Sequence, residues 1–342
     1  MIRVSYWQFR LPLYIALGGL AAVAVIAGVT GPALAHLYDT TVGTCKSNGA
    51  LCEAATATFN SRDLALRIAA QAIPLVLPAV LGMFWGAPLI ARELESGTFR
   101  LAWTQSRSRE TWFAAKLAVA GLTTLAVQGL ISLTLTWWWS PVGRANPNRF
   151  SPALFGAFGI APIGYAAFAL ALGITAGVVI RRTLPAMAAT LAAFVAVRLA
   201  VTYWVRPHFA APLHAVLPIT ANSSVGIDSI SRGQMSLNFF PPDLPNAWVL
   251  SAPVTNAAGQ QPSGAVLSQQ CPQLLQAQTG NGALPTAIHS CITTIGKTFH
   301  QTLVYQPASR YWPFQWAELG LFVALAAILA AFSAWWIRRR LA

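Results

Sequence analysis

Long uncharged, apolar stretches recur along the chain at lengths that suit membrane-spanning helices. About 20 apolar residues in a helix, each rising about 1.5 Å, cross the hydrocarbon core of a bilayer. Five stretches have this length or nearly so: Leu11–Tyr38, Ile68–Ala91, Leu117–Gly143, Phe150–Ile180 and Leu319–Ile337. A sixth, Thr183–Val197, becomes long enough only when it is continued past Arg198 to Trp204. The pattern predicts six transmembrane helices.

The composition supports a membrane protein and excludes a soluble one. Hydrophobic residues make up 56% of the chain and charged residues only 9%, with a mean hydropathy of +0.55. Soluble proteins average about 25% charged residues, because their surfaces must face water. In a soluble protein, a net charge of +13 would suggest nucleic-acid binding. In a membrane protein, the positions of the same charges instead indicate which segments lie on which side of the bilayer. We therefore expect an all-α integral membrane protein with no nucleic-acid partner.

The distribution of charge predicts the orientation of the six helices. If the N-terminus is cytoplasmic, the short inner segments hold twelve basic residues against three acids, and these basic residues lie close to the helix ends. The outer segments hold nine basic residues and six acids over much longer stretches. Positive residues concentrate on the cytoplasmic side of membrane proteins. We expect a multi-pass protein of the cell membrane with both termini in the cytoplasm.

The spans divide the chain into three regions. Residues 1–204 hold helices one to five, an interfacial helix at Met1–Arg10 and a cytoplasmic loop at 92–116. Residues 205–311, rich in Pro, Gln, Ser, Asn and Gly, predict a loop-rich extracellular domain between helices five and six. Its apolar stretch His208–Thr220 is too short to span a membrane and could form an extracellular cap or a re-entrant helix. Residues 312–342 hold helix six and a basic tail.

All four cysteines fall in the predicted outer segments. Cys45 and Cys52 lie in the first outer loop, and Cys271 and Cys291 lie in the long one. Disulfides persist in oxidising compartments, so this placement favours structural disulfides. Four cysteines allow three pairings. We expect the local pairs Cys45–Cys52 and Cys271–Cys291, because they need no assumption about tertiary structure. Pairing between the two loops, or free thiols, are the alternatives.

Two features inside the spans are unusual. Gly82 with Gly86, and Gly173 with Gly177, have the G-x-x-x-G spacing that permits close approach of helices. Arg198 is a charge in the outer half of an apolar helix, which costs about 2.5–3.5 kcal/mol at the bilayer centre. It could face an interface or an aqueous cavity, where it would contribute to a substrate path, or it could snorkel to the outer headgroups.

Signals for an enzyme are weak. Neither H-E-x-x-H nor G-x-S-x-G occurs, and Gly296-Lys297-Thr298 lacks the earlier glycine of a phosphate loop. The histidines of the predicted outer domain have no metal-ligand spacing. We expect no catalytic residue, no metal site and no cofactor in this chain.

The cytoplasmic loop at 92–116 carries the most informative stretch. A segment with Glu93 and Glu95 is followed by a break at Ser96-Gly97-Thr98. In the next element, Phe99–Gln105, apolar Phe99, Leu101 and Trp103 alternate with Arg100 and Thr104. Ser106 or Ser108 can cap the third helix. Phe99, Leu101 and Trp103 cannot all be solvated cheaply, so this surface should lie on the membrane or dock to a partner.

This stretch resembles the cytoplasmic loop of actinobacterial ABC transporter permeases of the export class. The shared pattern is A-R-E-x-E-x-G-T-x-R-L-A-W-T-Q-S-x-x-R-x-x-W-x-x-x-K, which begins here at Ala91 and ends at Lys116 without a gap. The six spans and the large segment between helices five and six also resemble that family, although the long outer segment itself has no recognised motif.

The resemblance implies a function and a set of site residues. Such a loop couples the permease to a separate cytoplasmic ATPase, which holds the ATP and magnesium. The coupling positions implied here are Glu93, Glu95, Gly97, Thr98, Arg100, Trp103, Thr104, Gln105 and Arg109. A second permease chain, giving a homodimer with helices two and five beside the path of an amphiphilic substrate, is also implied. The alternative from another class is a membrane-anchored sensor or assembly factor whose outer domain binds a ligand or envelope component.

Overall fold

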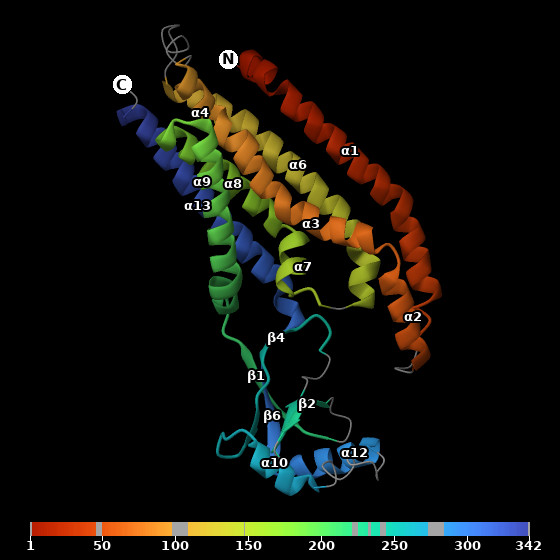
Figure 1. Ribbon diagram of the computed structural model, residues 1–342. Coiled ribbons are helices and arrows are strands. Elements are labelled where there is room, and N and C mark those ends of the chain that lie inside the picture. Colours follow the sequence, from red (N-terminus) through yellow and green to blue (C-terminus); the bar gives the residue numbers. More distant parts are fainter. Residues whose placement is uncertain are drawn as a thin grey trace. The chain divides into compact units, whose positions relative to one another are not determined.

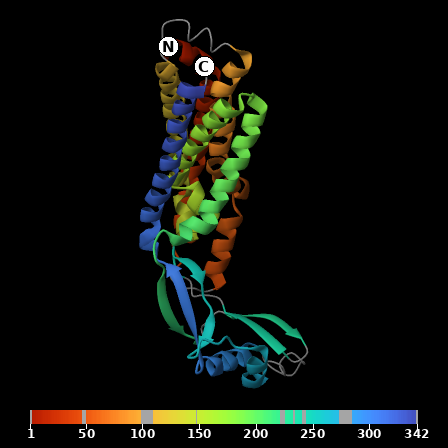
Figure 2. The same cartoon turned by 90° about the vertical axis from the view of Figure 1, so that its left-hand side faces the viewer.

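The computed structural model describes residues 2–45, 50–97, 109–146, 148–220, 225–231, 234–239, 244–272 and 284–340. The chain divides into two compact units. Unit 1 comprises Met1–Phe209 and Tyr311–Ala342, and unit 2 comprises Ala210–Arg310. The described residues of unit 1 form an elongated helical bundle, which Figures 1 and 2 show from two sides.

Six described helices are long and apolar enough to cross a membrane, which confirms the predicted number. Their spans are Leu13–Thr40, Leu64–Ser96, Thr111–Ala145, Ala161–Ile180, Thr183–His208 and Ala308–Arg339. The elements that form them are α1 (Ile2–Thr40), α3 (Leu64–Leu81) continued by η1 (Gly82–Gly86) and α4 (Ala87–Ser96), α6 (Arg109–Ala145), α8 (Ala161–Ile180), α9 (Thr183–Ala200) continued by η2 (Val201–Val205) and η3 (Arg206–His208), and α13 (Tyr311–Arg340).

Several helix boundaries differ from the prediction. The expected span Phe150–Ile180 is broken: α7 (Pro152–Ala157) is a separate short helix, and Gly159, with φ +84°, precedes α8. A positive φ suits glycine and interrupts a helix. In contrast, α1 runs without a break from Ile2, so the expected separate interfacial helix at Met1–Arg10 is not a distinct element. The fifth span extends beyond Trp204 to His208.

Helix α8 is the centre of the bundle, packed by α13, α9, α6 and the α3–η1–α4 helix. The two G-x-x-x-G motifs meet here. A Cβ atom added to Gly86 would lie 2.7 Å from the carbonyl oxygen of Leu170, and one added to Gly177 would lie 2.6 Å from that of Ala87. One on Gly173 would collide with the carbonyl of Gly82. The small residues therefore allow the two backbones to touch, as predicted, and the structure identifies them as each other's partners.

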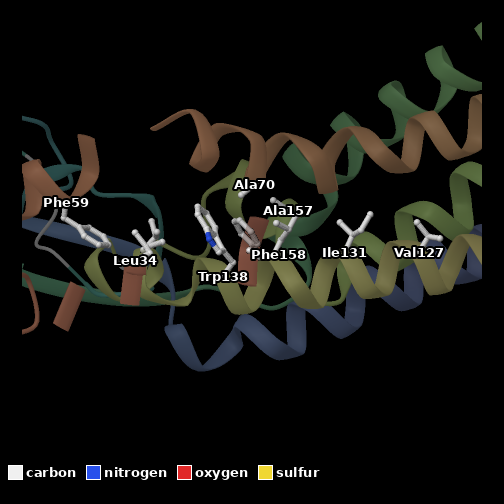
Figure 3. Close-up of a cluster of buried hydrophobic side chains, with 11 residues drawn as sticks. Leu34, Phe59, Ala70, Val127, Ile131, Trp138, Ala157 and Phe158 are labelled. Atoms are coloured by element: carbon white, nitrogen blue, oxygen red, sulfur yellow. The ribbon is translucent and has the colours of Figure 1, made fainter. Parts of the chain in front are cut away.

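Helix α1 is peripheral by comparison. It packs mainly along α6, and most of its apolar side chains are exposed on the single chain. Figure 3 shows the cluster that holds this side of the bundle together, in which Leu34 of α1 packs with Trp138 of α6 and with Phe59 of α2 (Ala50–Ser61). The indole nitrogen of Trp138 donates a hydrogen bond to Thr30 Oγ1 at 2.8 Å.

Unit 2 contains strands as well as loops, which the prediction of a loop-rich domain did not include. Strand β6 (Phe299–Gln306) pairs antiparallel with β1 (Leu213–Pro218), β4 (Trp248–Ser251) and β5 (Val254–Asn256). Strands β2 (Val225–Ser231) and β3 (Gln234–Phe239) form a hairpin. The stretch His208–Thr220 is thus not a re-entrant helix. It holds strand β1, because β6 satisfies its backbone hydrogen bonds.

Both expected disulfides are present. Cys45 joins Cys52, with Cα atoms 5.7 Å apart, between the end of α1 and helix α2. Cys271 joins Cys291, with Cα atoms 5.0 Å apart, and links the end of α10 (Gly264–Gln270) to α12 (Leu284–Ile295). Cys271, Cys291 and Ile295 are buried in unit 2 together with Leu303 of β6. The local pairing is confirmed.

Candidate coupling region and buried charge cluster

One end of the bundle gathers the ends of most helices together with a group of exposed arginines. The start of α1, the end of α4, the start of α6, the α8–α9 junction and the end of α13 all lie there (Figures 1 and 2). Exposed arginines mark these helix ends: Arg92, Arg181, Arg182, Arg338 and Arg339. We call this the arginine-rich end. It brings together the segments that the charge analysis assigned to one side of the membrane.

At this end Glu93 joins α4 to α6. Its carboxylate forms an ion pair with Lys116, whose ammonium also donates to the carbonyl of Leu89 at 3.4 Å and lies 5.0 Å from the ring centroid of Trp112. The side chains of Lys116 and Glu93 are only 6% and 18% exposed. Glu93 is therefore held largely inside the protein, where it fixes two helices to each other.

Glu95 joins α4 to α9. Its Oε2 atom accepts hydrogen bonds from the backbone N–H of Thr183 at 3.0 Å and from the Thr183 hydroxyl at 2.7 Å. Thr183 is the first residue of α9, whose first N–H groups have no partner within the helix. A carboxylate from another helix thus caps α9, and it is favourably placed at the positive end of the helix dipole.

The remaining predicted coupling residues follow α4. Gly97 ends this helix with φ +71°, a left-handed conformation that glycine adopts without strain. Thr98, Arg100, Trp103, Thr104 and Gln105 lie outside the described residues. Arg109 is the first residue of α6. Of the predicted set, the structure therefore brings Glu93 and Glu95 to one end of the bundle and places Gly97 and Arg109 at the two ends of the intervening segment.

A second group of charges is buried within the bundle, and it contains Arg198. Glu318 on α13 is fully buried, and its Oε1 atom accepts from the Tyr165 hydroxyl at 2.6 Å, from Arg206 Nη2 at 2.9 Å and from Arg198 Nη1 at 3.3 Å. Its Oε2 atom accepts from Arg206 Nε at 2.7 Å. We call these four residues the Glu318 cluster.

Both arginines of the cluster also lie on aromatic rings. The guanidinium carbon of Arg198 is 3.6 Å from the ring centroid of Tyr165, and that of Arg206 is 4.2 Å from the ring centroid of Phe155. Such cation–π contacts are stronger where water is excluded. Arg206 is bound to the carboxylate through two nitrogens, whereas Arg198 makes one longer contact and is 12% exposed. The two arginines of the cluster therefore carry two positive charges, of which the single carboxylate of Glu318 neutralises one.

Sequence reasoning found Arg198 but missed Arg206, Glu318 and Tyr165. The apolar runs end at Trp204 and begin again at Leu319, so they leave Arg206 beyond the fifth helix and Glu318 directly before the sixth. A usable signal existed: Arg198, Thr202 and Arg206 are spaced by four residues, which places them on one helix face. Arg206 Nη2 indeed lies 3.5 Å from the Thr202 hydroxyl. The partner carboxylate, by contrast, could not be identified from spacing.

Gln315, one turn before Glu318 on α13, holds together the backbone segments next to the Glu318 cluster. Its Oε1 atom accepts from the backbone N–H groups of Ile160 and Ala161 at 3.1 and 2.8 Å, at the start of α8. Its amide nitrogen donates to the carbonyls of Phe155 and Phe158 at 3.0 and 3.1 Å. One buried side chain thus satisfies backbone groups at the end of α7 and at the start of α8, and it binds the backbone of Phe155, on whose ring Arg206 lies.

Comparison with known proteins identifies one related family. A family model described as ABC-2 membrane transporter related matches residues 17–206, which is more than half of the chain. No curated protein and no solved structure compared with the chain matches it. The matched region begins in α1 and ends at Arg206, so it covers the second to fourth spans completely and the first and fifth almost completely. It also includes Glu93, Glu95 and both arginines of the Glu318 cluster.

Proposed function

Because the chain belongs to the ABC-2 membrane transporter-related family, we propose that it is the permease subunit of an ABC exporter that moves an amphiphilic substrate out of the cell. A separate cytoplasmic ATPase binds ATP and magnesium and hydrolyses the ATP. The match over residues 17–206 is the observation that carries this proposal. The uninterrupted resemblance from Ala91 to Lys116 supports the export class and the actinobacterial type.

The geometry of the arginine-rich end supports a coupling role. The segment from Gly97 to Arg109 connects α4 directly to α6, and Glu93 with Lys116 fixes these two helices to each other. Glu95 extends the connection to α9. A displacement applied to this segment by a moving ATPase would therefore act on three spans at once, rather than bend a single loop.

The transport path is proposed to lie between two copies of the chain. In the single chain, the α3–η1–α4 and α9 spans expose apolar side chains, among them Ile68, Val76, Phe84, Leu191 and Val195, which a second copy could cover. Arg198 extends from α9 and is the more exposed of the two cluster arginines. We place it beside the path, where the surplus positive charge would favour an anionic group of the substrate.

The decisive experiment measures coupling in a reconstituted complex. Trp103→Ala should cost about 2 kcal/mol or more of docking free energy, as loss of a central interface tryptophan does. Glu93→Lys should also reduce ATPase stimulation, because two ammonium groups would then face each other between α4 and α6. The readouts are pull-down of the ATPase and permease-stimulated ATP hydrolysis.

Trp204→Ala is the matched control, since Trp204 is an exposed tryptophan near the end of the span Thr183–His208 that lies away from the arginine-rich end. It should leave both readouts unchanged. If Trp103→Ala and Glu93→Lys retain full pull-down and stimulation, the segment is not the coupling element.

Orientation is tested with the cysteines. Both termini are proposed to be cytoplasmic and unit 2 extracellular, so a membrane-impermeant thiol reagent should label Cys45, Cys52, Cys271 and Cys291 in intact cells only after reduction. If reduced, denatured but sealed cells show no labelling, the outer segments are inside and the orientation is reversed.

A membrane-anchored sensor or assembly factor is the second candidate. One observation favours it: unit 2 lies outside the matched residues 17–206 and has a disulfide-linked core of its own. Co-purification separates the two functions. A permease should retain an ATPase in stoichiometric amount, whereas a sensor should be isolated without one.

A further inference from the structure

A pocket of about 240 Å³ opens in unit 1. The last turns of α6 line it, and α6 begins at the arginine-rich end and runs to the opposite end of the bundle (Figure 1). The pocket lies between the last turns of α6, the turn that leads into α7, and the start of α13. Its walls include Trp139, Phe158, Tyr311 and Trp312, and its polar groups include Asn148 and Arg149. None of these residues belongs to the coupling segment or to the Glu318 cluster.

The aromatic walls are held in place by their own contacts. Trp139 stacks on Phe158 with ring centroids 4.7 Å apart, and Tyr311 meets Trp312 edge to face at 5.5 Å. The Tyr311 hydroxyl accepts a hydrogen bond from Gln315 Nε2 at 3.3 Å. The pocket therefore has rigid apolar sides. Tryptophan and tyrosine are the residues that prefer the boundary between hydrocarbon and water.

Arg149 supplies the charge. It is exposed, and its guanidinium carbon lies 6.0 Å from the ring centroid of Tyr311. In the part of the chain that the structure describes, no carboxylate lies within salt-bridge distance of it. Arg144, in the last turn of α6 and five residues before Arg149, differs because it lies 3.9 Å from Asp39 and outside the pocket.

We propose that this pocket binds the anionic headgroup of an amphiphile, through a phosphate or carboxylate held by Arg149. Arginine binds both groups with charge-assisted hydrogen bonds. The volume is slightly below the roughly 300–1,000 Å³ of pockets that enclose drug-sized ligands, so it suits a headgroup rather than a whole molecule. The chain of the amphiphile would continue along the aromatic rim into the bilayer. The proposal stands without the export role, since either a bilayer lipid or a transported molecule could supply the headgroup.

The test is direct binding to the full-length protein in a non-ionic detergent. The lipid probes are dioleoylphosphatidylglycerol and, as its zwitterionic control, dioleoylphosphatidylcholine. The free-amphiphile probes are dodecyl phosphate and dodecylphosphocholine. Each probe is titrated, and the thermal midpoint gives an apparent Kd, because a ligand that binds the folded state raises its stability. Arg149→Gln should raise the apparent Kd of the anionic probes about tenfold, because a charge-assisted hydrogen bond is lost.

Arg144→Gln is the matched control, because it removes the same charge from a nearby exposed position, in the last turn of α6, outside the pocket. It should change the apparent Kd less than twofold. A second variant, Trp312→Ala, leaves the net charge of the protein unaltered and should raise the apparent Kd of the anionic probes severalfold. Stabilisation by phosphatidylglycerol alone would identify a lipid site, and stabilisation by dodecyl phosphate alone a site for a free amphiphile.

The proposal is overturned if Arg149→Gln binds the anionic probes as tightly as the wild type. It is also overturned if Arg149→Gln and Arg144→Gln weaken binding equally, because the net charge of +13 would then attract anions without a site. Since binding is measured without the ATPase, either result leaves the permease assignment unaffected.

Discussion

The Glu318 cluster and the arginine-rich end hold charges of the same kind in opposite circumstances. In the cluster, Glu318 contacts two arginines and a tyrosine within 3.3 Å, and its side chain has no exposure. At the arginine-rich end, by contrast, Arg92, Arg182 and Arg339 are exposed, although the ion pair of Glu93 with Lys116 is largely buried. Charges surrounded by apolar helices must satisfy one another, whereas charges at a helix end remain available to a partner.

This difference separates what each region contributes. An ion pair buried in a low-dielectric interior costs several kcal/mol per ion in lost hydration, which only close geometry repays. The Glu318 cluster therefore fixes α8, α9 and α13 relative to one another. The exposed arginines of the arginine-rich end lose little hydration, so their charges can set the register of a docking partner. Substitutions in the Glu318 cluster should therefore mainly lower stability, whereas substitutions at the arginine-rich end should mainly reduce coupling to the ATPase.

The largest effect is expected for Glu318→Leu. Removing this carboxylate leaves two arginines without their counter-ion, and breaking a buried ion pair in this way costs about 3–5 kcal/mol. The variant should lose most of its folded yield, measured by size-exclusion chromatography and thermal unfolding in detergent. Adding Arg206→Leu should restore part of the lost stability. If the single variant is as stable as the wild type, the cluster does not fix the helices.

Lys116→Met should have an intermediate effect. It leaves Glu93 without a partner, but Glu93 is partly exposed, so the cost should lie between that of a surface pair and a buried one, about 1–3 kcal/mol. The folded yield should fall less than for Glu318→Leu, while ATPase stimulation falls clearly. Normal ATPase stimulation by this variant would show that the ion pair between α4 and α6 does not transmit motion.

Arg198→Leu should affect transport more than folding. Glu318 keeps both of its contacts to Arg206, and removal of a charge from the membrane interior lowers the cost of insertion. Membrane abundance should be equal to or above that of the wild type, and export should fall. Abundance by immunoblot and substrate efflux from cells are the two measurements. Unchanged export would mean that Arg198 has no role in the transport path and only contacts the other residues of the Glu318 cluster.

The smallest effect is expected for Glu95→Ala. The variant removes the cap from the start of α9, but Glu95 is exposed and water can replace its hydrogen bonds. The thermal midpoint should fall slightly, and faster hydrogen exchange at the backbone N–H of Thr183 should be the clearer signal. Ser96→Ala, at the next exposed residue of α4, is the control and should leave that exchange rate unchanged.

The sequence by itself determined the features that depend on local chemistry. The number of spans follows from runs of apolar residues, because transfer into hydrocarbon is a sum over neighbouring residues. The disulfides Cys45–Cys52 and Cys271–Cys291 join cysteines only 7 and 20 residues apart, which made the local pairing the simplest one. The G-x-x-x-G spacings predicted close helix contact in the same way.

Only the tertiary structure decided which distant groups meet. Glu318 lies 120 residues after Arg198, and nothing in either apolar run indicates that α13 rather than another helix supplies the counter-ion. The stretch His208–Thr220 became a strand because β6, far along the chain, supplied its hydrogen-bond partners. Hydrophobic patterning specifies how much chain enters the membrane. It does not specify the pairing of buried polar groups, because that depends on the few distances that packing creates.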